Sequence, residues 1–189
     1  EYYRVYSEKN TELWSLYHHN RISKEALIVE RFRYPLQRVG AYNDKLVLQL
    51  NADYLSVLSE QGELVPQARE LLDYLKSRSY RLHIISNGFK EVQFKKMKSA
   101  GIENYFEKII LSDEVGVNKP HPDIFRYALN KTGSSKNTSL MIGDNYDADI
   151  LGAMRSGLDQ VYFNPLQKQI SDEFPTYEVQ TLSEICDIL

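Results

Sequence analysis

Apolar positions divide the chain into two parts that have different periodicities. In the first sixty or so residues they recur at helical spacing, with almost no strand pattern. Thr11 and Ser23 are the expected N-caps of two helices, because their hydroxyl groups can accept the first free amides of a helix. A third helix is expected over residues 44–60. The positions assigned to helix stripes are Leu13, Leu16, Tyr17, Ala26, Val29, Arg33, Leu46, Leu50, Val57 and Leu58. This part predicts a small all-helical unit over residues 1–62.

From residue 63 onward, short apolar runs alternate with amphipathic segments. Pro66 suits the first position of a helix, and Gly101 and Gly157 follow expected helices, which glycine commonly ends. The expected strands are residues 81–86, 108–112, 139–143 and 160–164, and the later helices are residues 89–100, 122–131 and 146–156. Such alternation requires crossover connections. The predicted fold class is therefore α/β, with a doubly wound, mostly parallel sheet over residues 63–189.

Composition and charge narrow the class of protein. The 189 residues (22.0 kDa) are 42% hydrophobic and 26% charged, which excludes a disordered, collagen-like or low-complexity chain. With 23 Lys and Arg against 26 Asp and Glu, the formal net charge is −3, so nucleic acid is not an expected partner. Cys186 is the only cysteine, and no apolar stretch reaches 18 residues. We therefore expect a globular cytoplasmic protein without a membrane partner.

Polar residues that follow the first expected strand suit an anion. Ligands of such sheets bind beyond the carboxyl ends of the strands. Ser86 offers a hydroxyl group there, and the amides of Asn87 and Gly88 stand at the entry to a helix, where they can donate to an anion. Lys119, in a later loop, adds a positive charge for phosphate or for a carboxylate. These residues predict a small phosphorylated substrate.

Three aspartates near the end of the third expected strand are candidate metal ligands. Carboxylate oxygens are the ligands that Mg²⁺ prefers, and water and substrate phosphate usually complete its octahedron. Asp144 follows the strand and Asp149 lies in the next expected helix, so both can face one ion. Asp147 is more typical of an exposed acid at the start of a helix. The sequence predicts Mg²⁺ as cofactor, with Asp144 and Asp149 as ligands.

Three runs of residues, in this order and at these separations, carry a family resemblance. IISNG (Ile84–Gly88), VNKPHPDIF (Val117–Phe125) and MIGDNYDADI (Met141–Ile150) resemble motifs II, III and IV of the haloacid dehalogenase (HAD) superfamily. The helical first part resembles that superfamily's four-helix cap, and residues 64–164 resemble its α/β core. The runs SNGF and LSDEVGVNKPHPDIF most resemble the pyrimidine 5′-nucleotidase branch.

The resemblance implies a Mg²⁺-dependent phosphomonoester hydrolase that acts on nucleoside monophosphates. It assigns Ser86 and the neighbouring amides to the transferring phosphoryl group and Lys119 to the charge on nucleophile and phosphate. It assigns Asp144 to Mg²⁺, and Asp149 to the support of the metal shell or of Lys119. The implied mechanism is attack of an aspartate on phosphorus, followed by hydrolysis of the aspartyl-phosphate by water that a second aspartate activates.

The sequence departs from the superfamily's pattern at the first motif, a strand that ends in Asp-x-Asp. The only Asp-x-Asp here is Asp147-Ala148-Asp149, inside the fourth-motif region. In the superfamily the missing strand lies in the middle of the sheet, between the strands that end here at Ser86 and Asp144. Without it, two strands would expose unpaired N–H and C=O groups. We therefore expect the chain to begin inside the first cap helix, and these 189 residues alone to lack turnover.

Two other functions stay open. A haloacid dehalogenase would share the Ser-Asn-Gly element and the aspartate nucleophile but needs no metal, so Asp144 argues against it. A non-catalytic phosphate-binding module would keep Ser86, Lys119 and Asp144 without a nucleophile. The histidines show no metal-ligand spacing. The aromatic residues near the start are expected mainly in the core of the cap, with stacking on a nucleobase as the alternative for one of them; they are Tyr2, Tyr3, Tyr6, Trp14 and Tyr17. The exact substrate and the oligomeric state stay open.

Overall fold

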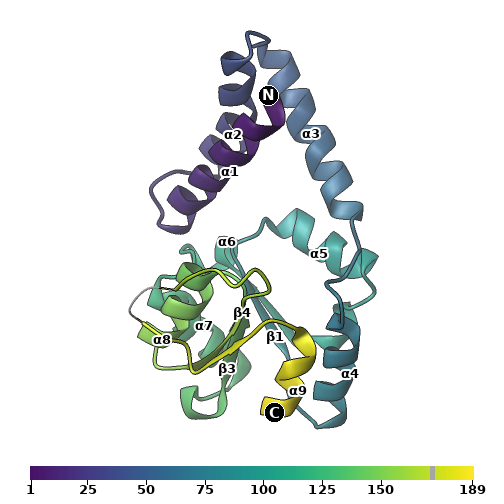
Figure 1. Cartoon of the computed structure of the whole chain (residues 1–189), viewed down its shortest axis with the longest axis vertical. Helices are drawn as coiled ribbons and strands as arrows, with labels where there is room; N and C mark the ends of the chain where they lie inside the picture. The colour runs from purple at the N-terminus through teal and green to yellow at the C-terminus, as the bar shows by residue number, and fades with distance from the viewer. Residues whose placement is uncertain (171–172) are drawn as a thin grey trace.

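Three long helices form the upper part of the molecule, and an α/β unit forms the lower part (Figure 1). The computed structural model describes residues 1–170 and 173–189. Ser23 caps the second helix as predicted, because its hydroxyl group accepts the amide of Ala26 at 3.2 Å. The helices are α1 (Tyr2–His18), α2 (Lys24–Arg38) and α3 (Asp44–Glu60), and the bounds of α3 confirm the prediction.

Two predictions in this helical part are wrong. Thr11 is not an N-cap, since α1 begins well before it and its hydroxyl group donates to the carbonyl four residues earlier, at 3.0 Å. The predicted stripe of α3 is also displaced: Leu46 and Val57 are exposed, whereas Val47 is buried. α3 packs against α2 and against α5 (Lys90–Ser99). The face toward these neighbours is therefore covered, whichever residues the sequence places there.

The α/β unit alternates short strands with helices. Its strands are β1 (His83–Ser86), β2 (Lys108–Leu111), β3 (Leu140–Gly143), β4 (Asp159–Phe163) and β5 (Tyr177–Val179). Its other α-helices are α4 (Ala68–Ser77), α6 (Ser112–Val115), α7 (Pro122–Thr132), α8 (Gly152–Arg155) and α9 (Ile185–Ile188). Three 3-10 segments are η1 (Glu103–Tyr105), η2 (Lys136–Thr138) and η4 (Leu182–Glu184), and η3 (Tyr146–Leu151) is a π-helix. The strand pairings are parallel, which confirms the predicted α/β class.

The parallel sheet is split into two pieces. β1 pairs with β2, while β3 pairs with β4 and β4 with β5. Between the pieces lies a groove of about 1030 Å³, lined by residues of β1 and of β3. Within residues 1–170 and 173–189, the facing edges of β1 and β3 have no strand partner. The split lies where the sequence lacks the central strand that the resemblance requires.

Several smaller features of the α/β unit differ from the sequence pattern. β5, α6 and α9 are not predicted, because each is only three or four residues long and shows no periodicity. The helix expected over residues 146–156 is divided into η3 and α8. Pro66 does not begin α4: Gln67, whose φ is 67°, stands between it and the first helical residue.

An apolar cluster joins the two parts of the molecule. We call α1, α2 and α3 the cap and the α/β unit the core; the division at residues 62 and 63 stays a prediction. Phe89 and Val92, at the start of α5, pack with Leu13, Tyr17 and Leu27 of the cap. The cap thus rests on the segment that directly follows the Ser86–Gly88 loop.

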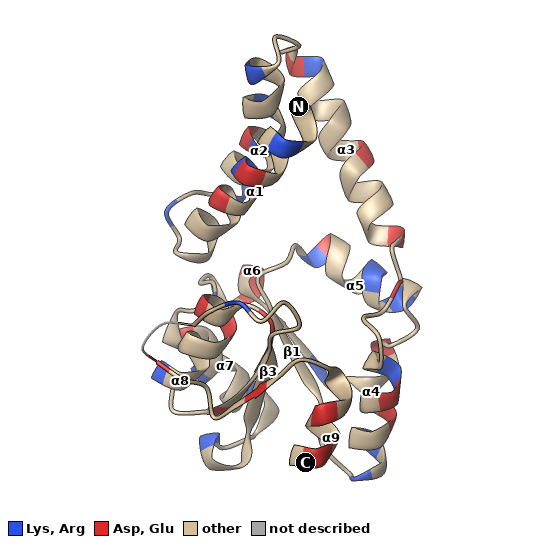
Figure 2. Ribbon diagram, viewed as in Figure 1, with Lys and Arg blue, Asp and Glu red and all other residues tan. Residues whose placement is uncertain are grey.

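The surface carries both signs of charge. Lys and Arg are interspersed with Asp and Glu on the cap and on the core (Figure 2). This distribution accompanies the small net charge of −3. Among the described residues, no helix combines the length and the apolar character needed to cross a membrane.

Candidate active site

The structure gathers Lys119 and Asp149 at the carboxyl ends of β1 and β3. Lys119 Nζ lies 2.6 Å from Asp149 Oδ1 and donates to the carbonyl oxygen of Ile85 at 2.7 Å. The two charged side chains are only 10% and 8% exposed. The ammonium group is therefore held between the last residues of β1 and the segment after β3.

Asn87 fixes the backbone of Lys119. Its side-chain amide donates to the Lys119 carbonyl oxygen (2.9 Å), and its side-chain oxygen accepts the Lys119 amide (2.8 Å). Asn87 is 6% exposed, so this paired contact is shielded from water. It joins the loop after β1 to the loop before α7. The sequence assigned Asn87 to substrate through its backbone amide, and that role stays a prediction; the structure adds a positioning role for the side chain.

Ser86 and Gly88 satisfy each other in this structure. The Gly88 amide donates to Ser86 Oγ at 3.0 Å, which turns the chain sharply at the end of β1. The Ser86 hydroxyl group keeps its own proton for another acceptor. The assignment of both residues to a phosphoryl group stays a prediction, and the amide of Gly88 must exchange partners to serve it.

Asp144 and Asp149 have different surroundings. Asp149 is buried, and its second oxygen accepts the amide of Asn145 at 3.1 Å, so both of its oxygens have partners. Asp144 is exposed at the mouth of the groove between β1 and β3. Within residues 1–170 and 173–189, no three His, Cys, Asp or Glu side chains converge as a metal site. Asp144 is thus an open carboxylate, whereas Asp149 holds Lys119.

The π-helix η3 brings Asp149 to this position. Asn145 caps it, because its side-chain oxygen accepts the amide of Ala148 at 2.9 Å. The wider turn of a π-helix is rare and is found mainly at functional sites. Its presence explains why residues 146–156 do not form the continuous α-helix that the apolar spacing predicts.

Gly143 makes room for the Asp149 carboxylate. A Cβ atom at Gly143 would stand 2.5 Å from both Cβ and Oδ2 of Asp149, which is too close for any real contact. We expect Gly143→Ala to lower the free energy of unfolding by about 1–3 kcal/mol, because Asp149 cannot move without leaving Lys119. The measurement is urea denaturation followed by circular dichroism.

Gly88→Ala is the matched control for this substitution. There the obstacle is the amide end of the flexible Gln93 side chain, at 2.0 Å, which can rotate away. We expect a smaller loss of stability from Gly88→Ala than from Gly143→Ala. Equal losses would contradict the role given to the contact between Gly143 and Asp149.

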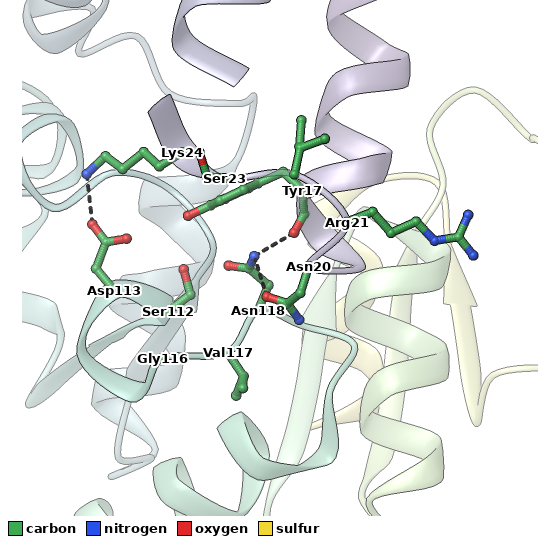
Figure 3. Close-up of a pocket in the computed structure, with 11 residues that line it drawn as sticks. Tyr17, Asn20, Arg21, Ser23, Lys24, Ser112, Asp113, Gly116, Val117 and Asn118 are labelled. Carbon is green, nitrogen blue, oxygen red and sulfur yellow. Dashed lines mark hydrogen bonds and ion pairs between the residues drawn. The ribbon is translucent and has the colours of Figure 1, made fainter. Parts of the chain in front are cut away.

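Polar contacts fasten the end of α1 to the core beside this site. Asn118 donates to the carbonyl oxygen of Tyr17 (2.6 Å) and lies 3.2 Å from Asn20 Oδ1. Lys24 pairs with Asp113 at 3.0 Å across the same boundary, where a pocket of about 460 Å³ opens (Figure 3). The sequence gave no signal for these contacts, because residues about a hundred positions apart meet only in the folded chain.

Two histidines of the cap also reach the candidate site. His19 Nε2 lies 3.2 Å from Asp147 Oδ2. Burial lowers the pKa of His18, and Lys119 lowers it further, whereas Asp149 raises it. His18 is therefore close enough to the ion pair to feel both charges. Sequence spacing alone treats each histidine as an ordinary solvated or packed residue.

A family model identifies the fold and the chemistry class together. The model described as haloacid dehalogenase-like hydrolase matches residues 18–163. The chain belongs to the haloacid dehalogenase-like hydrolase family. This confirms the resemblance carried by the three runs of residues at Ile84–Gly88, Val117–Phe125 and Met141–Ile150.

Similar proteins cover the whole chain. It is 31% identical to the pyrimidine 5′-nucleotidase PynA of Streptococcus pneumoniae and 30% identical to the pyrimidine 5′-nucleotidase YjjG of Escherichia coli. Each comparison covers 100% of this chain, and 79% of PynA and 83% of YjjG. The crystal structure of the HAD-hydrolase YfnB from Bacillus subtilis, bound to magnesium, matches with a TM-score of 0.91 at 29% identity, over 99% of this chain and 81% of that one. This HAD hydrolase therefore resembles 5′-nucleotidases in sequence and a magnesium-bound hydrolase in fold.

Proposed function

We propose that this protein is the site-bearing part of a Mg²⁺-dependent phosphomonoester hydrolase whose substrates are nucleoside monophosphates. The observation that carries the proposal is the buried pair of Lys119 and Asp149, held beside Ser86 and the open carboxylate of Asp144. A fixed positive charge next to a hydroxyl donor suits the phosphoryl group of a monoester. The names of PynA and YjjG support nucleotides as the substrate class.

Each residue has a separate role in this proposal. Ser86 donates its hydroxyl proton to a phosphoryl oxygen, and Lys119 neutralises charge on that group during transfer. Asp149 keeps the ammonium group of Lys119 in place, and Asn87 does the same for its backbone. Asp144 fits Mg²⁺, because such sites commonly use one or two carboxylates with water and substrate phosphate. The ion would supply charge stabilisation at the phosphoryl oxygens.

The nucleophile of this reaction belongs in the groove between β1 and β3. The proposed step is attack of an aspartate oxygen on phosphorus, with departure of the nucleoside alcohol, followed by hydrolysis of the aspartyl-phosphate to free phosphate. A strand with such an aspartate would pair with both free edges and place the carboxylate next to Ser86 and Lys119. We infer that residues 1–189 alone bind phosphate but do not turn over.

The test compares the 189-residue chain with the gene product purified from its natural source. Both samples are incubated with uridine 5′-monophosphate and MgCl₂, and released phosphate is measured; the intact mass of the natural product is set against 22.0 kDa. We expect turnover from the natural product and none above the blank from the 189-residue chain. Turnover by the 189-residue chain would contradict the place given to the nucleophile.

The same assay separates the alternative functions. Phosphate release that survives EDTA would contradict the Mg²⁺ requirement, and metal-independent halide release from a small haloacid would favour a dehalogenase. A natural product that binds phosphate without hydrolysing any monoester would refute the hydrolase and support the phosphate-binding module. Loss of turnover in EDTA, restored by MgCl₂, is the expected result.

A further inference from the structure

The last two turns of α1 present Trp14 and His18 to the candidate site. The two side chains are one helical turn apart, and their ring centroids are separated by 5.6 Å. Trp14 also stacks on Phe89, with centroids 5.6 Å apart and an interplanar angle of 26°. Phe89 directly follows Gly88. The aromatic face of α1 therefore lies beside the loop to which the proposed function assigns the phosphoryl group.

The neighbours of His18 in the chain are both fixed to the core. Asn118, which precedes Lys119, donates to the carbonyl oxygen of Tyr17 at 2.6 Å (Figure 3). On the other side, His19 lies 3.2 Å from Asp147. These two contacts hold the end of α1 over the segment that carries the buried ion pair. His18, between them, is half-buried and is left without a printed protein partner of its own among the polar contacts of Tyr17 and His19.

The chemistry of these two rings is complementary. Trp14 offers a flat apolar surface that is half-buried, with Phe89 packed against it. Burial and Lys119 lower the pKa of His18, so its ring is neutral at pH 7 and can both donate and accept a hydrogen bond. A flat surface next to such a group suits a ligand that has a planar polar ring a few ångströms from its phosphate.

We propose that Trp14 and His18 are specificity-determining residues of the cap, which contact the planar base or its sugar in a nucleoside monophosphate. This inference rests on the proposed function, because it needs the phosphoryl group beside Ser86. It goes further by assigning discrimination between nucleotides and small sugar phosphates to two named side chains. Stacking of a base on an aromatic ring is commonly sufficient for about tenfold or more in affinity.

The test uses Trp14 itself as the reporter, because it is the only tryptophan of the chain. The 189-residue chain is titrated with uridine 5′-monophosphate, ribose 5-phosphate and inorganic phosphate, each with MgCl₂, while Trp14 emission is recorded. We expect the nucleotide to change the emission and to bind with a Kd about tenfold below that of ribose 5-phosphate. Inorganic phosphate should bind with little change in emission.

Variants show whether the two side chains cause this preference. His18→Ala and Trp14→Leu should each bring the Kd ratio of ribose 5-phosphate to nucleotide near one, measured by isothermal calorimetry, while the Kd of inorganic phosphate stays the same. His18→Asn keeps a hydrogen-bonding group and should restore part of the preference. Tyr3→Leu is the matched control, since Tyr3 is an aromatic residue of the same helix that is 78% exposed, and it should leave all three constants unchanged.

Each outcome bears on the inference separately from the proposed function. Equal Kd values for the nucleotide and ribose 5-phosphate in the unmodified chain would overturn the inference while leaving the phosphate site intact. A preference that persists in both His18→Ala and Trp14→Leu would overturn it as well. A chain that binds none of the three ligands would refute the proposed function, and the inference with it. Far-ultraviolet circular dichroism confirms that each variant is folded.

Discussion

Replacing Lys119 with methionine is expected to lower the free energy of unfolding by about 3–5 kcal/mol. The substitution keeps most of the apolar stem but removes the charge, and it leaves the Asp149 carboxylate buried at 8% exposure without its counter-ion. Breaking a buried pair by removing one partner costs this much because the remaining charge has lost its water and gained nothing in return. The measurement is urea denaturation of both proteins, with equal slopes as the condition for comparing their midpoints.

The pair of Arg81 and Glu107 is the matched control. Its atoms are 3.0 Å apart, as close as a good ion pair, but the side chains are 52% and 39% exposed. Arg81→Met should therefore cost about 1 kcal/mol or less. Lys119→Met combined with Asp149→Leu should recover much of the loss, because both charges are then absent. A loss below about 1 kcal/mol in Lys119→Met would show that Asp149 does not depend on Lys119.

The alternation of elements in the core could be predicted because it is written in local patterns. β1, β2, β3 and β4 each appear as a short apolar run, and Ser23 and Asn43 mark helix starts by side-chain chemistry that acts over three residues. Parallel pairing follows from the helices between the strands. None of these features requires knowledge of what lies across the fold.

Burial within the cap could not be predicted in the same way. Leu46 and Val57 are as apolar as Val47, yet only Val47 packs against Phe32 and Leu36. Which face is covered depends on the neighbours that α3 meets, namely α2 and α5. Periodicity identifies a helix, but the choice among its apolar faces is made by tertiary contacts.

The candidate site shows the same division. Ser86, Lys119 and Asp144 stand at recognisable positions in three runs of residues, and their chemistry can be argued from type and order. The contacts that place them are not visible in the sequence: Asn87 grips the Lys119 backbone, and Gly143 yields space to Asp149. The tethering of α1 by Asn118 is equally hidden, since its partner is a backbone carbonyl 101 positions away.

The difference between Asp144 and Asp149 has a direct experimental consequence. In the natural product that shows Mg²⁺-dependent turnover, Asp144→Asn is expected to lower kcat by about a hundredfold or more, because a bound cation supplies several kcal/mol of charge stabilisation. Stability should change by no more than about 0.5 kcal/mol, since Asp144 is exposed and has no buried partner to abandon. Phosphate release at increasing MgCl₂, together with urea denaturation, measures both effects.

Asp159→Asn is the control for this substitution, because Asp159 is also an exposed aspartate next to a strand but stands at the start of β4, at the opposite edge of the parallel sheet. It should leave both kcat and the MgCl₂ dependence unchanged. Wild-type turnover in Asp144→Asn would remove Mg²⁺ from that carboxylate. A large loss of stability in Asp144→Asn would show instead that its role is structural, like that of Asp149. Loss of turnover with the fold intact is the combination that only a group acting on the substrate or its metal produces.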